Sequence, residues 1–372
     1  MRVGWRYGSE RHPERPIVVM DAGAGCRRLP MAEGGVMGLL RFLLASLVLV
    51  SHMGITVAGV NPGVVAVIVF YMLAGHVVAS LWRRRPAGGW LSGALWFWHD
   101  RAWRILPLYF ACLAFAIVVW SLGAQSYFLS REPQLQDWLA NLLIIPLNYY
   151  MYGGQDTFTL LPPAWSLAAE LQFYLLVPFL LCRSYWAVIA AIASFLVFLC
   201  AQVGWLHTDV FGYRLLAGVG FIFLAGTLLE NPATWARRLL LVLWLGSSLY
   251  AVWLLTLGQH VPHNIEVALG LAFGLPVLVL LQRYRFTGRF QALQRAAGNL
   301  SYGLFLLHFP VVWLLELAGW SGPQTVWAVW LFSALLASAG HYGVERPLWA
   351  RYRQQLPAAG SAHIDTRRAA EG

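Results

Sequence analysis

Ten separate apolar runs occupy most of this 372-residue chain, each near the 17–25 residues that a helix needs to cross a bilayer. Only 11% of the residues are charged, against about 25% in a soluble domain. Together these features predict an all-α integral membrane protein with about ten transmembrane helices. The runs lie at residues 37–58, 62–82, 102–122, 165–182, 184–203, 211–229, 236–257, 264–282, 300–319 and 324–343.

The arginines gather in every second loop, and this pattern predicts the orientation of the chain. Cytoplasmic loops of membrane proteins carry an excess of basic residues. The loops after the even-numbered runs are rich in arginine, whereas the alternate loops hold little beyond Arg131 and Arg214. We therefore expect both termini on the cytoplasmic side. The net charge of +10 follows from these loops and does not indicate a nucleic-acid partner.

The remaining segments are expected to be tails and one long loop. Residues 1–36 are polar and rich in Arg, Gly and Pro, which is typical of a disordered cytoplasmic tail or of a mis-assigned start. A ten-helix domain is predicted over residues 37–349, followed by a cytoplasmic tail at 350–372. Within the loop at 123–164, residues 138–150 are apolar but short, and they predict an interfacial or re-entrant segment. The four scattered cysteines indicate neither a disulfide framework nor a metal site.

The first run carries two polar side chains that a membrane span normally excludes. Arg41 and His52 lie eleven positions apart, so they share one helix face and are separated by about 16 Å along the axis. Ionisable residues inside a span commonly mark a functional interior. The alternative interpretation is a snorkelling arginine and a hydrogen-bonded core histidine.

A second pair of basic residues opens the third run. Arg101 and Arg104 are three positions apart and share a helix face at the predicted cytoplasmic side. The planar fork of arginine donates two parallel hydrogen bonds and so suits phosphate groups. Ordinary positive flanking of a span is the alternative.

Polar residues of the later runs complete the set of candidates. Glu170 lies about one and a half turns inside the fourth run, at the predicted depth of His52, so we expect it to orient the imidazole. Alternatively, Glu170 stabilises the start of its own helix. Secondary candidates are Ser301, Tyr302, His308 and Glu345. A histidine placed like His308 is commonly a structural hydrogen-bonding residue.

Taken in order, these motifs resemble those of membrane-bound acyltransferase family 3, whose members O-acylate sugars and related acceptors. The similarity covers about residues 37–349. At Ala74 the family usually has serine, so any contact made by that hydroxyl is lost here. The matching elements are Arg41 with His52, Arg101-x-x-Arg104, Trp165-Ser166-Leu167-x-x-Glu170, Ser301-Tyr302 with His308, and Glu345-x-Pro347.

The resemblance implies an acyl-CoA-dependent O-acyltransferase of the bacterial inner membrane. It implies acetyl-CoA, or another acyl-CoA, as co-substrate rather than a bound cofactor, and it implies no metal. Arg41, Arg101 and Arg104 are the implied donor-binding residues. His52 is the implied general base, and Glu170 is its partner.

The acceptor is expected from analogy with the family. The first choice is a hydroxyl of a surface polysaccharide, such as exopolysaccharide or O-antigen, or of its lipid-linked repeat unit. A small molecule such as a macrolide is the second. The alternative from another class is a transporter or flippase without acyl transfer. A CoA enzyme needs a phosphate site such as Arg101 and Arg104 offer, whereas a proton-coupled carrier does not.

Overall fold

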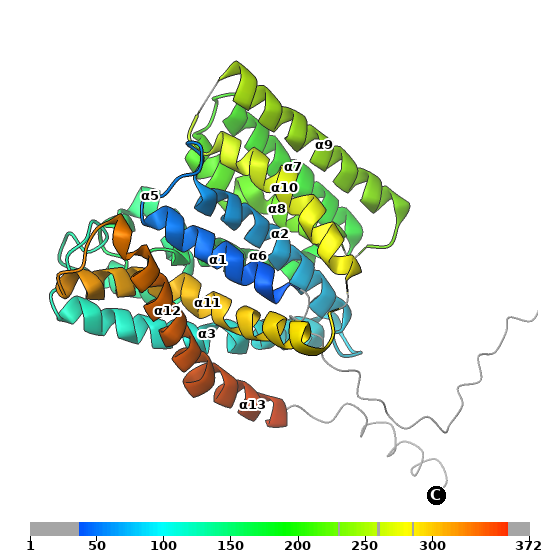
Figure 1. Cartoon of the computed structure of the whole chain (residues 1–372). Coiled ribbons are helices and arrows are strands. Elements are labelled where there is room, and N and C mark those ends of the chain that lie inside the picture. The colour runs from blue at the N-terminus through cyan, green and yellow to red at the C-terminus, as the bar shows by residue number, and fades with distance from the viewer. Residues whose placement is uncertain (1–36, 230, 259–260, 285, 356–372) are drawn as a thin grey trace, which may run out of the picture. The chain divides into compact units, whose positions relative to one another are not determined.

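The computed structural model describes residues 37–229, 231–258, 261–284 and 286–355, and this part of the chain is almost entirely helical (Figure 1). Its extended pairings are two isolated bridges, Val57 with Val60 and Leu129 with Phe158. The predicted all-α class is confirmed. The tail predicted at 1–36 lies outside the described residues.

The helices, in chain order, are α1 (Gly38–His52), α2 (Pro62–Arg83), α3 (Trp90–Ser121), α4 (Leu135–Leu143), η1 (Ile145–Tyr149), α5 (Tyr150–Gly153), η2 (Gln155–Thr157), α6 (Ala164–Leu180), α7 (Ser184–Gln202), η3 (Val210–Arg214), α8 (Leu216–Leu228), α9 (Thr234–Leu257), α10 (Asn264–Arg283), α11 (Gly288–Leu317), η4 (Pro323–Thr325), α12 (Val326–Gly340), η5 (His341–Glu345) and α13 (Arg346–Gln355).

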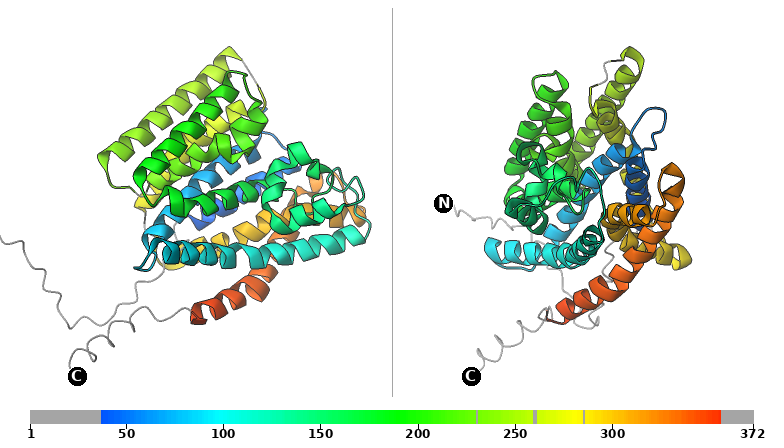
Figure 2. Two further views of the ribbon diagram at one scale, coloured as in Figure 1. Left: turned by 180° about the vertical axis from the view of Figure 1, so that it is seen from behind. Right: turned by 90° about the vertical axis from the view of Figure 1, so that its left-hand side faces the viewer.

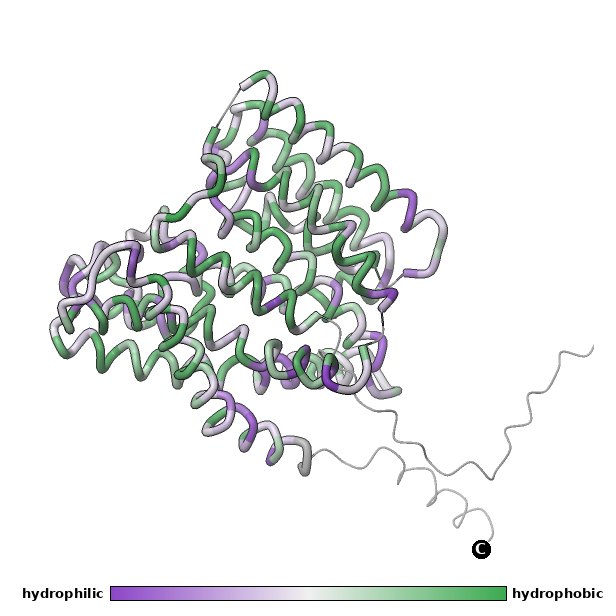
Figure 3. The backbone as a smooth tube through the Cα atoms, viewed as in Figure 1, coloured by the Kyte–Doolittle hydropathy of each residue, from purple (hydrophilic) through white to green (hydrophobic). Residues whose placement is uncertain are grey.

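Each of the ten predicted runs contains a helix, and the hydropathy colouring follows those helices (Figure 3). Among the described residues, seven helical segments are long and apolar enough to cross a membrane: α2, α3, α7, η3 with α8, α9, α10 and α11. Helices α1, α6 and α12 are apolar but shorter. The chain is thus a multi-pass membrane protein, while the count of ten spans and the orientation stay predictions.

Three helix boundaries differ from those that hydropathy predicts. Helix α1 ends at His52 and not at residue 58, because the following loop contains Gly54 and Gly59 at φ of +80° and +79°, which favour glycine. Helices α3 and α11 begin twelve residues before the apolar runs, at Trp90 and Gly288. Polar side chains stand between these helix starts and the apolar runs, so hydropathy does not join the two parts. They are His99, Asp100 and Arg101 in α3, and Arg289, Gln294 and Arg295 in α11. The motif residues of both helices therefore lie in helix interiors.

Helix α2 is the central element of the packing. It contacts α1 on one side and α8 and α10 on the other (Figures 1 and 2). Gly75 of α2 lies against the carbonyl of Phe223, and Gly226 of α8 lies against Met72, so a Cβ at either glycine would overlap backbone. Small residues allow such close approach between membrane helices.

The loop between α3 and α6 forms short helices, among them α4 and η1 over the predicted interfacial segment. Arg131 donates to both carboxylate oxygens of Asp137 at 2.6 Å, and the same carboxylate caps the start of α4. At the other end of the described chain, α13 extends to Gln355, so the tail predicted from 350 begins as a helix. Residues 356–372 lie outside the described part.

Candidate active site

All three arginines predicted to bind the donor border one cavity, which we call the arginine cavity. Arg41 comes from α1, and Arg101 and Arg104 come from α3. Glu170 of α6 and Tyr302 of α11 are among its other polar lining residues. The cavity measures about 160 Å³, so it accommodates the end of a larger molecule and not a whole nucleotide.

Both arginines of α3 form ion pairs with carboxylate side chains. Arg101 donates through Nε and Nη2 to Asp100 at 3.0 and 2.5 Å. Arg104 forms an ion pair with Glu345, which also contacts His341 Nδ1 at 3.0 Å. The predicted candidate Glu345 therefore contacts the arginine cavity through Arg104. The same pair joins η5 to α3.

The remaining predicted residues of this cavity contact their own helices or α3. Glu170 accepts a hydrogen bond from Tyr174, one turn later on α6. Ser301 donates to the Gly298 carbonyl at 2.8 Å, and Tyr302 donates to the Ile105 carbonyl at 3.3 Å. Ala74 is almost completely buried and its small side chain borders the cavity.

A second cavity of about 220 Å³, the histidine cavity, contains His52. Its other polar lining includes Arg214 and His263, and Trp165 and Tyr213 provide aromatic walls. Three residues line both cavities, so the two cavities adjoin, and these side chains form the wall between them. They are Val67, Ser166 and Phe305.

His52 pairs with the other predicted histidine. Its Nδ1 lies 2.9 Å from Nε2 of His308. The ring centroids are 5.1 Å apart with 12° between the planes, so the rings meet edge to edge in nearly one plane. His308 is 1% exposed, whereas His52 is exposed and borders the cavity. A buried histidine thus holds an accessible one.

This arrangement corrects one contact expected from the sequence. The partner of His52 is His308 and the partner of Glu170 is Tyr174, so the predicted hydrogen bond between His52 and Glu170 is replaced by two others. The physical reason is depth. Because α1 ends at His52, the imidazole lies at the helix end, whereas Glu170 lies one and a half turns inside α6.

Sequence reasoning left Arg214 without a role and did not identify its partners. Arg214 Nε donates to Asp209 Oδ1 at 2.8 Å, and His263 Nε2 lies 3.1 Å from the same oxygen. Burial of Asp209 favours the neutral acid, but the hydrogen bonds from His263 and Arg214 outweigh it and hold the pKa of Asp209 below its usual value. The available signal was an arginine within an apolar run.

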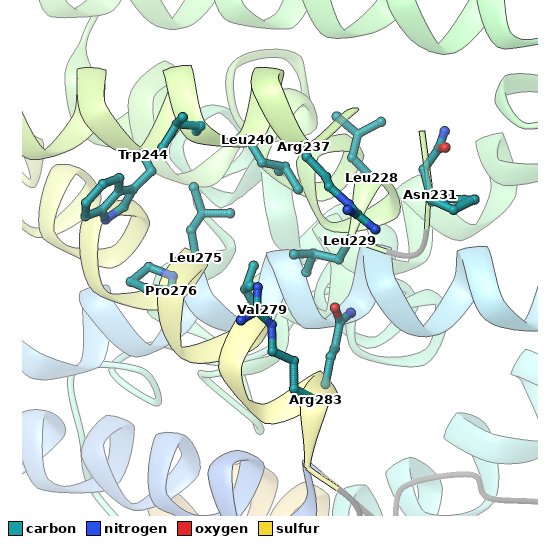
Figure 4. Close-up of a pocket in the computed structure, with 13 residues that line it drawn as sticks. Leu228, Leu229, Asn231, Arg237, Leu240, Trp244, Leu275, Pro276, Val279 and Arg283 are labelled. Carbon is teal, nitrogen blue, oxygen red and sulfur yellow. The ribbon is translucent and has the colours of Figure 1, made fainter. Parts of the chain in front are cut away.

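A larger cavity of about 660 Å³ lies between α8, α9 and α10 (Figure 4). Arg237 and Arg283 line it together with leucines and Trp244. None of the predicted site residues borders it. Among the described residues, no three His, Cys, Asp or Glu side chains gather closely enough to hold a metal ion.

Comparison with known proteins shows what this chain is similar to. The model of a family described as an acyltransferase domain (acyltransferase 3) matches residues 37–342. An uncharacterized protein of Aquifex aeolicus (strain VF5) is 36% identical over 162 residues, which are 42% of this chain and 72% of that protein. No solved structure matches the chain significantly.

Proposed function

Because the chain belongs to the acyltransferase 3 family, we propose that this membrane acyltransferase takes its acyl group from acyl-CoA. The proposed acceptor is a hydroxyl of a surface polysaccharide or of its lipid-linked repeat unit. One observation carries the proposal: an arginine-lined cavity and a histidine-lined cavity share the walls Val67, Ser166 and Phe305. A phosphorylated donor suits the first and a hydroxyl acceptor suits the second.

The donor enters through the arginine cavity. Its small volume fits the pantetheine end, with the CoA phosphates near Arg101 and Arg104. The acyl end then extends past the shared wall residues toward His52. Glu170 borders the same cavity as Arg41 and Arg101. We assign it the role of balancing these arginines, in place of the contact with His52 expected from the sequence.

His52 is the proposed general base, and His308 orients it. If His52 donates from Nδ1 to His308 Nε2, its own Nε2 carries a lone pair that can accept the proton of the acceptor hydroxyl. The hydroxyl oxygen attacks the thioester carbonyl, the carbon–sulfur bond breaks, and the proton passes to the leaving thiolate. The products are the ester and free CoA.

The test is acyl transfer by the protein reconstituted in lipid vesicles. The substrates are acetyl-CoA labelled in the acetyl group and a crude lipid-linked glycan fraction, and the product is alkali-labile ester. We expect His52→Ala to lose about 10²–10⁴-fold in rate, the usual contribution of a general base. Binding of acetyl-CoA should persist in that variant, because its cavity is separate.

Two results would refute the proposal in different ways. Normal transfer by a folded His52→Ala protein would exclude His52 as the base. Absence of acetyl-CoA binding by the wild-type protein would remove the donor assignment, and a transporter without acyl transfer would then be the better account.

A further inference from the structure

The histidine cavity contains a cation, Arg214, to which the reaction described so far gives no role. Arg214 is the last residue of the π-helix η3 and borders the same cavity as His52. The two side chains line the same cavity of about 220 Å³, so one small group bound there can meet both. An ionisable side chain in a spanning segment carries a desolvation cost, which is commonly tolerated for a functional reason.

Several contacts fix the plane of this guanidinium. Nε donates to Asp209, and the guanidinium carbon lies 4.6 Å from the centre of the Trp165 ring and 5.2 Å from that of Tyr213. The backbone is fixed as well, because Asn148 Nδ2 donates to the carbonyl oxygens of both Arg214 and Trp165 at 3.1 Å. Stacking and a directed hydrogen bond preorganise an arginine for one orientation.

The outer nitrogens of Arg214 are available to a ligand. Throughout the described residues, its guanidinium makes one hydrogen bond, from Nε, which leaves the four N–H donors of Nη1 and Nη2. The side chain is 17% exposed. Among the described residues, the buried side-chain nitrogens and oxygens that lack a hydrogen-bond partner include no atom of Arg214. Fixed, unused donors therefore border the cavity beside His52.

We propose that Arg214 is a second catalytic residue, which stabilises the oxyanion of the acyl-transfer reaction; the inference rests on the proposed function. Attack of the acceptor oxygen on the thioester carbon moves the carbonyl π electrons onto the carbonyl oxygen. Nη1 and Nη2 donate to that oxygen while His52 holds the acceptor proton. The oxyanion then collapses, the thiolate leaves, and it receives the proton from His52.

The charge balance of the cavity favours this role over the binding of an anionic acceptor. Asp209 compensates Arg214 in the resting protein, so the site has little attraction for a permanent anion. The donors meet full negative charge only when the oxyanion forms. Interactions that strengthen in the transition state accelerate the chemical step.

The experiment measures kcat and the acceptor KM of Arg214→Gln and Arg214→Lys in vesicles, with saturating acetyl-CoA. Removal of an oxyanion donor typically costs about 10²–10³-fold in kcat. We expect a loss of this size for Arg214→Gln with little change in acceptor KM. Arg214→Lys keeps the charge but loses the planar fork, so we expect it to recover only part of the rate. Retained acetyl-CoA binding reports folding in each variant.

A positioning role for Asp209 gives a second readout. Asp209→Asn should lower kcat in the wild-type background but add nothing to Arg214→Gln, because its effect acts through the guanidinium. A raised acceptor KM with unchanged kcat in Arg214→Gln would overturn the inference and assign Arg214 to acceptor binding. Unchanged kinetics in that variant would overturn the inference alone, whereas a wild-type protein without transfer would overturn the proposed function as well.

Discussion

The arginine cavity and the histidine cavity share three wall residues but differ in how their polar groups are stabilised. In the arginine cavity, guanidinium groups contact carboxylates, as in the pairs of Arg101 with Asp100 and Arg104 with Glu345. The histidine cavity also has such a pair, Arg214 with Asp209, but its proposed base, His52, contacts a second imidazole, that of His308. The first arrangement suits a charged ligand that replaces ionic contacts. The second suits proton transfer, since no carboxylate is required to hold the base.

Apart from the His52 and Arg214 variants, the largest effect that separates the two cavities is expected from His308. Replacing it with Phe removes the hydrogen bond to Nδ1 of His52 and should lower kcat about 10²-fold, at the low end of what a general base contributes. Donor affinity should not change, because His308 does not border the arginine cavity. Single-turnover transfer together with acetyl-CoA binding in vesicles measures both quantities.

A matched variant distinguishes orientation from packing. His308→Gln retains a polar atom that can bond His52 but loses the aromatic ring, so it should recover more activity than His308→Phe. If the two variants are equally active, or if Phe is the better one, the ring packs against Phe309 and does not orient the base.

The sequence predicted the helices and the residues of the site better than it predicted their contacts. Spacing placed Arg41 and His52 on one face of α1, and each borders a cavity. The contact between His52 and Glu170 was predicted from depth alone, and it failed because the end of α1 depends on the glycine-containing loop after His52. Hydropathy counts apolar residues and is insensitive to such a boundary.

The lateral arrangement of the helices was beyond sequence reasoning for a different reason. His308 reaches His52 because α11 packs along α1, although the two residues are 256 positions apart. Arg214 gains its partners from a π-helix and from the preceding Asp209, whose placement no periodicity in the chain indicates. Such contacts follow from packing in three dimensions and not from local spacing.

The second prediction concerns the arginine cavity. Arg101→Gln should raise the KM for acetyl-CoA about tenfold and leave kcat nearly unchanged, because a hydrogen bond to a charged group contributes about 1.5–3 kcal/mol. Arg183→Gln is the matched control, since Arg183 is exposed and borders neither cavity. A fall in kcat with constant KM in Arg101→Gln would place this arginine at the reaction and not at the donor phosphates.

The smallest effect is expected at Ala74, the position at which the motif resemblance predicts serine. Ala74→Ser adds one hydroxyl to a helix face that borders the arginine cavity, and a serine there can also bond the carbonyl four residues earlier on α2. We therefore expect unchanged stability and less than about a threefold change in donor KM, as for substitutions within ±0.5 kcal/mol. The control is Ala79→Ser, on the same helix but outside both cavities. A tighter donor KM for Ala74→Ser alone indicates that the hydroxyl contacts the donor. A tenfold rise in donor KM instead means that the close packing of α2 requires the small side chain. The volume of the arginine cavity, more than its charges, then limits how tightly the donor binds.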